Sequence, residues 1–132
     1  MRGDYGTIII GDRTSVQENC VLHARINEKC EVSSFAQIGH GALLHNCTVK
    51  DYAVIGVGAV VCDYATVGEW SIVGKGAVVV SGQTVPDGKV VVGVPAKVVR
   101  DVLESDRKAW SIYKDAYADL ALRYPKGLRK IK

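Results

Sequence analysis

The chain has 132 residues, of which 48% are hydrophobic and 23% charged, and its formal charge at pH 7 is +3. This balance fits one soluble globular protein, and the small charge without a Lys/Arg run argues against nucleic acid as a partner. No apolar run approaches the roughly 20 residues that span a bilayer, and no signal peptide is visible, so we expect a cytoplasmic protein that does not bind membranes. Four cysteines without a paired spacing fit the same reducing compartment.

A repeat of six residues covers most of the chain and is its strongest pattern. Only two steps break it, one of four residues from Leu22 to Ile26 and one of five from Leu44 to Val49. A helix would repeat at 3.6 residues and a strand at 2, whereas a period of six predicts an all-β solenoid, a β-helix in which three hexapeptides form one triangular coil. The repeated positions are Ile10, Val16, Leu22, Ile26, Val32, Ile38, Leu44, Val49, Ile55, Val61, Val67, Val73, Val79, Val85 and Val91.

A small residue stands two places before most of these aliphatic residues. Cys20, Cys30 and Cys47 occupy this position, which is elsewhere filled by alanine. We therefore expect these three cysteines to be small core residues and not metal ligands or nucleophiles. Cys62 lies outside the position and is not placed by the pattern.

The period changes after Pro95, which we expect to help end the β-helix. Large apolar residues then recur every seven positions, at Leu103, Trp110, Tyr117 and Tyr124, which predicts an amphipathic helix over residues 102–124. The sequence therefore predicts a β-helix over residues 1–100 and a C-terminal helix and tail over residues 101–132. We expect the helix to pack along the β-helix or across a neighbouring subunit.

The three histidines of the chain, His23, His40 and His45, all fall within one short segment. His23 and His45 each follow a repeated leucine, and if the extra residues after Leu22 form a loop, Leu22 and Leu44 stack in adjacent coils. The two imidazoles would then lie one above the other on the outer surface, about 4.8 Å apart along the stack. Three histidines with an open fourth position are typical of catalytic zinc; the alternative is that all three are solvated surface residues.

His40 is displaced to another corner of the triangular coil, because it follows Ile38 by two residues. It is poorly placed to join His23 and His45 within one chain. A neighbouring subunit of a three-fold ring could supply its own His40, so the geometry predicts a metal site at a trimer interface.

Polar residues near the start of the chain could support such a site. Gln17 follows Val16 as His23 follows Leu22, so its side chain should lie on the outer surface, where it could hydrogen-bond a metal-bound water. Arg2 and Asp4 could pair with each other or across an interface, a contact worth little if it is exposed. For each of them the alternative is a polar residue on a solvated coil.

Several segments resemble the γ-class carbonic anhydrase family. They are Arg-Gly-Asp at residues 2–4, Val-Gln-Glu-Asn-Cys-Val-Leu-His at 16–23, Ile-Gly-His-Gly-Ala-Leu-Leu-His-Asn-Cys at 38–47 and Gly-Val-Pro-Ala-Lys-Val-Val-Arg at 93–100. The tail at residues 117–124 is most similar to the branch of the phenylacetate-degradation and carnitine-operon proteins. The histidine motif is specific, whereas many acyltransferases share the hexapeptide repeat.

The resemblance implies a left-handed parallel β-helix, an exception to the usual right-handed crossover, and a homotrimer with metal sites at its interfaces. The implied ligands of zinc, or alternatively of iron or cobalt, are His23 and His45 of one chain and His40 of its neighbour. Gln17 would position the metal-bound water.

The resemblance further implies that Arg2 and Asp4 form the interface pair that orders the site, with Glu18 where the family often has aspartate. Two positions depart from the best-studied members of the class. Tyr5 stands where they have a glutamate, and Ile26 replaces the glutamate that ferries protons.

The function predicted from these residues is hydration of carbon dioxide to bicarbonate by a metal-bound hydroxide. The alternatives are hydrolysis of an acyl-coenzyme A thioester at the same metal, a hexapeptide acyltransferase with a histidine base, and a non-catalytic trimeric scaffold.

Overall fold

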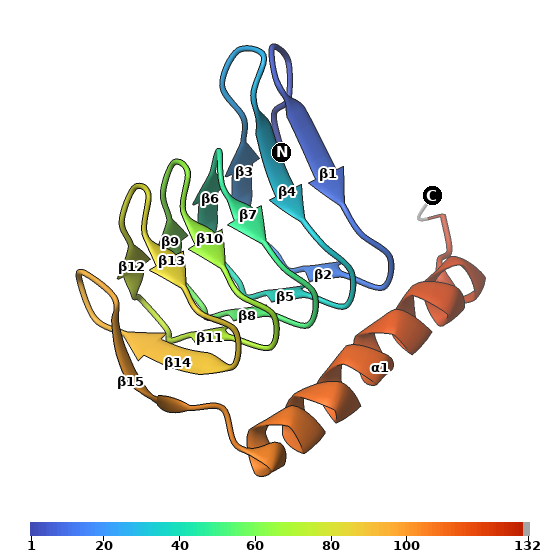
Figure 1. Ribbon diagram of the computed structural model, residues 1–132. Helices are drawn as coiled ribbons and strands as arrows, with labels where there is room; N and C mark the ends of the chain where they lie inside the picture. The colour runs from blue at the N-terminus through green and yellow to red at the C-terminus, as the bar shows by residue number, and fades with distance from the viewer. Residues whose placement is uncertain (131–132) are drawn as a thin grey trace.

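The computed structural model describes residues 1–130; residues 131 and 132, the end of the predicted tail, lie outside the described range. The chain forms the predicted left-handed parallel β-helix, followed by a single helix (Figure 1). The coils stack so that each strand pairs in parallel with the equivalent strand of the next coil, and three sheets result. None of the helices described is long and apolar enough to cross a membrane.

Each sheet collects one strand from every coil. The first sheet contains β1 (Thr7–Ile10), β4 (Lys29–Val32), β7 (Thr48–Val49), β10 (Thr66–Val67) and β13 (Thr84–Val85). The second contains β2 (Ser15–Val16), β5 (Gln37–Ile38), β8 (Val54–Ile55), β11 (Ile72–Val73) and β14 (Lys89–Val92), with β15 (Lys97–Asp101) antiparallel to β14. The third contains β3 (Val21–His23), β6 (Leu43–His45), β9 (Val60–Val61) and β12 (Val78–Val79).

The repeated aliphatic residues fill the interior of the solenoid, as the period predicts. Twelve of them are fully buried, and the small residues two places earlier pack beside them, including Cys30 and Cys47. Burying one such aliphatic side chain stabilises the fold by about 1.5–3 kcal/mol. Ile26 was wrongly assigned to this series: it is 67% exposed. The extra residues after His23 form a loop that carries Ile26 away from the core.

At the corner between the first and second sheets, aromatic residues form a column, one residue in each coil. The ring centroids of Phe35 and Tyr52 are 4.9 Å apart and those of Tyr52 and Trp70 4.6 Å apart, with nearly parallel planes. Arg13 extends the column over the Phe35 ring. All four residues have a positive φ, near 57°, which is unusual for such side chains. We call Arg13, Phe35, Tyr52 and Trp70 the aromatic corner.

Helix α1 (Glu104–Gly127) runs beside the aromatic corner (Figure 1). Lys114 is 5% exposed, donates a hydrogen bond to the backbone oxygen of Tyr52 and lies 4.9 Å from the centre of the Trp70 ring. Burial lowers the pKa of Lys114 to about 8. Asp115 adds an ion pair with Arg13 at 3.0 Å. Cations above aromatic rings therefore help to hold the helix to the solenoid.

Within one chain, the predicted apolar stripe of this helix packs against the solenoid only in part. Tyr117 is 37% exposed, Tyr124 59% exposed and Leu103 55% exposed, and only Trp110 of the four is half-buried. The contacting face instead centres on Lys114, because that side chain reaches the aromatic corner.

Candidate functional site

His23 and His45 lie in direct contact on adjacent coils. Strands β3 and β6 pair so that Leu22 lies opposite Leu44 and His23 opposite His45. Both leucines point into the core, so the residues that follow them point outward. Nδ1 of His23 is 2.9 Å from Nε2 of His45, and the ring centroids are 5.0 Å apart. The stacking expected from the repeat is therefore present.

Arg2 and Asp63 flank the two imidazoles. A guanidinium nitrogen of Arg2 lies 3.1 Å from Nε2 of His23, and a carboxylate oxygen of Asp63 lies 2.8 Å from Nδ1 of His45. We call Arg2, His23, His45 and Asp63 the histidine corner; it lies between the third and first sheets.

Hydrogen-bond chemistry assigns the protons along the histidine corner. Arginine can only donate and a carboxylate can only accept. Nε2 of His23 therefore accepts from Arg2, and its Nδ1–H donates to Nε2 of His45. His45 in turn donates its Nδ1–H to Asp63. All four groups are satisfied, and the lone pair of His45 Nε2 faces His23.

His40 lies at a different corner, between the second and third sheets. Its Nδ1 is 2.8 Å from a carboxylate oxygen of Glu18, and its backbone N–H donates to the side-chain oxygen of Gln17 at 3.2 Å. Residues 1–130 of one chain contain no group of three His, Cys, Asp or Glu side chains able to hold a metal ion. Completion of the site by His40 of a neighbouring subunit stays a prediction.

The remaining predicted site residues lie close to the histidine corner. Arg2 and Asp4 form an ion pair at 3.5 Å, and both side chains are largely exposed. A cleft of about 570 Å³ opens beside them, lined also by Tyr5, His23 and Arg25. A small substrate could therefore reach His23 from solvent.

The loop after His23 also borders this cleft. Its Glu28 accepts hydrogen bonds from the side chain of Asn46 and from the hydroxyl of Tyr64, the latter at 2.9 Å. The bond to Glu28 raises the pKa of Tyr64. Glu28 is thus tied to two neighbouring coils.

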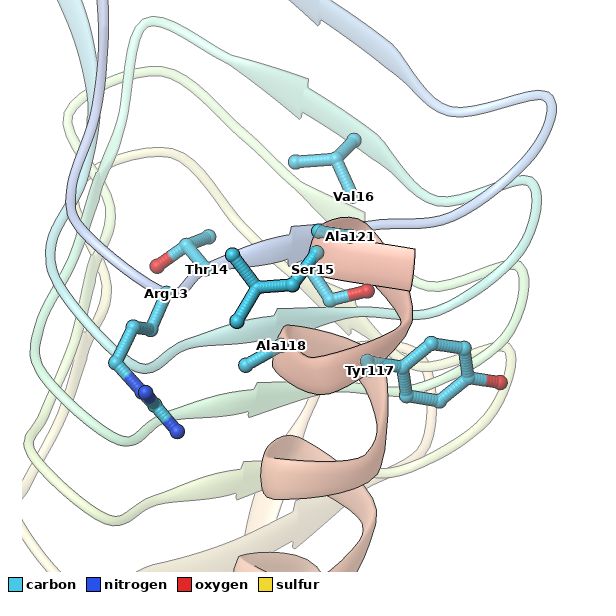
Figure 2. A pocket seen from close by; sticks show the side chains of 8 residues that line it. Arg13, Thr14, Ser15, Val16, Tyr117, Ala118 and Ala121 are labelled. Atoms are coloured by element: carbon cyan, nitrogen blue, oxygen red, sulfur yellow. The ribbon is translucent and has the colours of Figure 1, made fainter. Parts of the chain in front are cut away.

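Gln17 lies beneath α1, at the edge of a cavity of about 220 Å³ that Gln37 and Trp110 also line. The side-chain oxygen of Gln37 is buried there without a hydrogen-bond partner among residues 1–130. A separate pocket of about 500 Å³ lies between α1 and β2, where Arg13, Ser15, Tyr117 and Ala118 line it (Figure 2). None of the predicted site residues lines this second pocket.

Sequence reasoning missed Asp63, although a signal for it was present. Strands β6 and β9 pair Leu44 with Val61, so the coil after His45 is 17 residues long, and Asp63 is the residue that follows the register partner of His45. Cys62, which the pattern could not place, follows Val61 and therefore lies one coil beyond His45. Burial and the charge of Asp63 raise the pKa of the Cys62 thiol.

The side chains present fit a transition metal. Imidazole nitrogen suits zinc, iron and cobalt, and protein-bound metals are usually held by histidines whose second nitrogen donates to a carboxylate or a carbonyl. His45 with Asp63 and His40 with Glu18 both have this arrangement. Imidazole nitrogens of His23 and His45 would hold such an ion, and its binding would displace the hydrogen bond that now joins the two rings.

The fold and these corners define a hexapeptide-repeat β-helix protein with a histidine cluster on its outer surface. The chain is 35% identical to the carnitine operon protein CaiE of Salmonella agona over 132 residues, which are 100% of this chain and 67% of that protein. It therefore belongs to the family of the CaiE carnitine operon proteins, and it spans about two thirds of the length of the curated relatives that it matches. No family model matches the sequence.

Two solved structures are similar to the chain over nearly its whole length. A Bacillus cereus protein provisionally classed as an acetyltransferase superimposes with a TM-score of 0.91 and 35% identity, over 94% of this chain and 72% of that one. A hexapeptide transferase family protein of Anaplasma phagocytophilum gives a TM-score of 0.87 and 32% identity, over 93% and 72%. Both are relatives by sequence as well as by fold.

Proposed function

We propose that this protein is a metal-dependent hydratase that converts carbon dioxide to bicarbonate, at a three-histidine site shared between subunits of a homotrimer. The observation that carries the proposal is the 2.9 Å contact between His23 Nδ1 and His45 Nε2 on stacked coils. Two surface imidazoles that share no core role and converge through their nitrogens are the arrangement that a shared metal ion requires.

Each residue has a defined task in this proposal. His23 and His45, with His40 of a neighbouring subunit, would hold zinc or alternatively iron or cobalt, and such an ion lowers the pKa of bound water to about 7. Gln17 already has its oxygen engaged by the backbone of His40, so its amide N–H groups are left to orient the attacking water.

Arg2 and Asp4 would order the interface side of the site. Arg2 forms an ion pair with Asp4 and donates to His23, so it connects the start of the chain to the first histidine. The adjoining cleft would admit the substrate.

Acyl transfer is the second candidate, and the names of the solved relatives favour it. Two of them, each more than 30% identical to this chain, are classed as transferases. In that reaction an imidazole of the histidine corner would act as general base and remove the proton of the acceptor substrate. The same histidines would then work without a metal, so metal dependence separates the two candidates.

The test combines metal content with two assays. Tag-free protein should contain about one metal ion per chain, and its mass in solution should be three times the 14.2 kDa of the chain. Carbon dioxide hydration, followed by stopped-flow with a pH indicator, should disappear on chelation and return with added zinc. Consumption of acetyl-coenzyme A is measured on the same samples.

Protein that takes up no metal, even from added zinc, would overturn the hydratase proposal. If that protein still consumed acetyl-coenzyme A, the transferase candidate would replace it. An intact trimer with neither activity would support the remaining alternative, a non-catalytic trimeric scaffold.

A further inference from the structure

Asp63 differs from the other aspartates on the coils in what it contacts. Asp51 accepts the backbone N–H of Ser34 at 2.8 Å, and Asp87 accepts that of Glu69 at 2.9 Å; both therefore tie neighbouring coils together. Within residues 1–130 the carboxylate of Asp63 instead contacts side chains, those of His45 and Arg25.

Two donors converge on one oxygen of Asp63. Nδ1 of His45 and Nε of Arg25 each lie 2.8 Å from Oδ1, and the Asp63 side chain is only 18% exposed. A hydrogen bond to an ionised group that is largely shielded from water is stronger than one between neutral groups. The carboxylate is therefore fixed in place by Arg25 and can fix the imidazole of His45.

The consequence for His45 is a single tautomer. With Nδ1–H donated to Asp63, only Nε2 carries a lone pair, and this lone pair faces His23 at 2.9 Å. A carboxylate on the far nitrogen also makes the imidazole a stronger ligand, and loss of such a partner typically weakens metal binding by about 10–100-fold.

We infer that Asp63 is the positioning residue of the metal site: it orients His45 and sets the affinity of the histidine corner for a divalent metal, with Arg25 holding Asp63 in place. This inference rests on the proposed function, since it presupposes a metal at His23 and His45. It adds a carboxylate one coil beyond His45, at a position that none of the sequence motifs singled out.

The test measures zinc affinity by competition with a chromophoric chelator. Asp63→Asn keeps the size of the side chain and removes its charge, and it should raise the Kd for zinc by about 10–100-fold. Asp51→Asn is the matched control, because it makes the same chemical change at a coil aspartate that contacts backbone; it should leave the Kd within about twofold of the unmutated protein. Arg25→Gln should weaken zinc binding in the same direction but less.

A second readout separates orientation from general damage. The cobalt-substituted protein should show a visible absorption band that shifts in Asp63→Asn and stays in place in Asp51→Asn. Asp63→Glu restores the negative charge and should recover part of the affinity. If Asp63→Asn does not yield folded protein, Arg25→Gln decides the question, since its side chain is half exposed.

The outcomes distinguish failure of the proposed function from failure of the role assigned to Asp63. Unmutated protein that binds no zinc overturns the proposed function and this inference with it. Unmutated protein that binds zinc, together with an unchanged Kd in both Asp63→Asn and Arg25→Gln, overturns the role of Asp63 and leaves the proposed function standing.

Discussion

The aromatic corner and the histidine corner are turns of the same solenoid, but their rings meet in different ways. At the aromatic corner, Tyr52 and Trp70 stack with planes 5° apart, and helix α1 covers them. At the histidine corner, the rings of His23 and His45 are tilted by 36° and meet through their nitrogens beside an open cleft. Stacked faces bury apolar area and stabilise the fold, whereas facing edges bring lone pairs together.

The residues in the tight turns show the same contrast. Near the histidine corner the positive-φ position is filled by Asn27 and Asn46, since asparagine adopts this conformation at little cost, and by one aromatic residue, Tyr64. At the aromatic corner it is filled by Phe35, Tyr52 and Trp70, for which the conformation is unfavourable. The stacking and the cations of α1 must offset this strain, so the aromatic corner should matter for stability and the histidine corner for chemistry.

The largest effect should come from His45→Ala. Loss of one ligand should weaken zinc binding by more than about 100-fold, since even the outer partners of a ligand are worth about 10–100-fold. Carbon dioxide hydration should fall with it, while the urea midpoint changes little because His45 lies outside the core. Metal analysis, stopped-flow kinetics and urea unfolding measure the three quantities. A His45→Ala variant that kept both its zinc and its activity would contradict the chemical role assigned to the histidine corner.

Trp70→Ala should lower the stability of the fold and leave zinc binding unchanged. It removes the stack on Tyr52 and the contacts of Lys114 and Arg107 with the indole ring. We expect a loss of about 2–4 kcal/mol in the free energy of unfolding, from the stacking, the two cation–π contacts and the lost burial. The Kd for zinc should not change. Trp70→Gly is the control, because glycine relieves the strain of the positive φ and should lose less stability than alanine.

The buried Lys114 should make stability depend on pH. Its pKa is lowered from 10.5 to about 8 in the folded chain. Between these values the unfolded chain binds more protons than the folded chain, so this residue makes the free energy of unfolding rise with pH. The difference between the unmutated protein and Lys114→Met should therefore change by about 1–3 kcal/mol between pH 7.5 and 10 in favour of the unmutated protein. Parallel pH curves from urea unfolding would contradict a perturbed Lys114.

The smallest effect should follow from Asp115→Ala. The ion pair of Asp115 with Arg13 is half or more exposed on both sides. Such pairs contribute about 0.2–1 kcal/mol, and salt screens them. Urea unfolding at low and high salt should therefore show a difference of a few tenths of a kcal/mol at most, with zinc affinity unchanged. A loss as large as that of Trp70→Ala would mean that α1 is held by its ion pair with Arg13 and not by its contacts with the aromatic rings.

The repeat allowed most of the fold to be predicted, because each core position depends only on its own coil. Leu22 and Leu44 stack as expected, and this alone placed His23 on His45. Asp63 could have been found as the residue after the register partner of His45, but a lone aspartate on a polar coil carries no distinguishing pattern. The packing of α1 could not be predicted, because burial of Lys114 depends on the rings of Tyr52 and Trp70, which two different coils bring together. Ile26 was misassigned because a loop residue can match a period by chance.

The loop after His23 shows that this architecture tolerates changes in length at a corner. Twenty-two residues separate Leu22 from its strand partner Leu44, whereas 17 separate Leu44 from its partner Val61, and the pairing of the strands is intact on both sides. A whole coil could therefore be gained or lost beyond β9 without changing what surrounds His45. In evolutionary terms, length and chemistry are free to diverge separately in such a solenoid, since selection on the site acts on only a few adjacent coils.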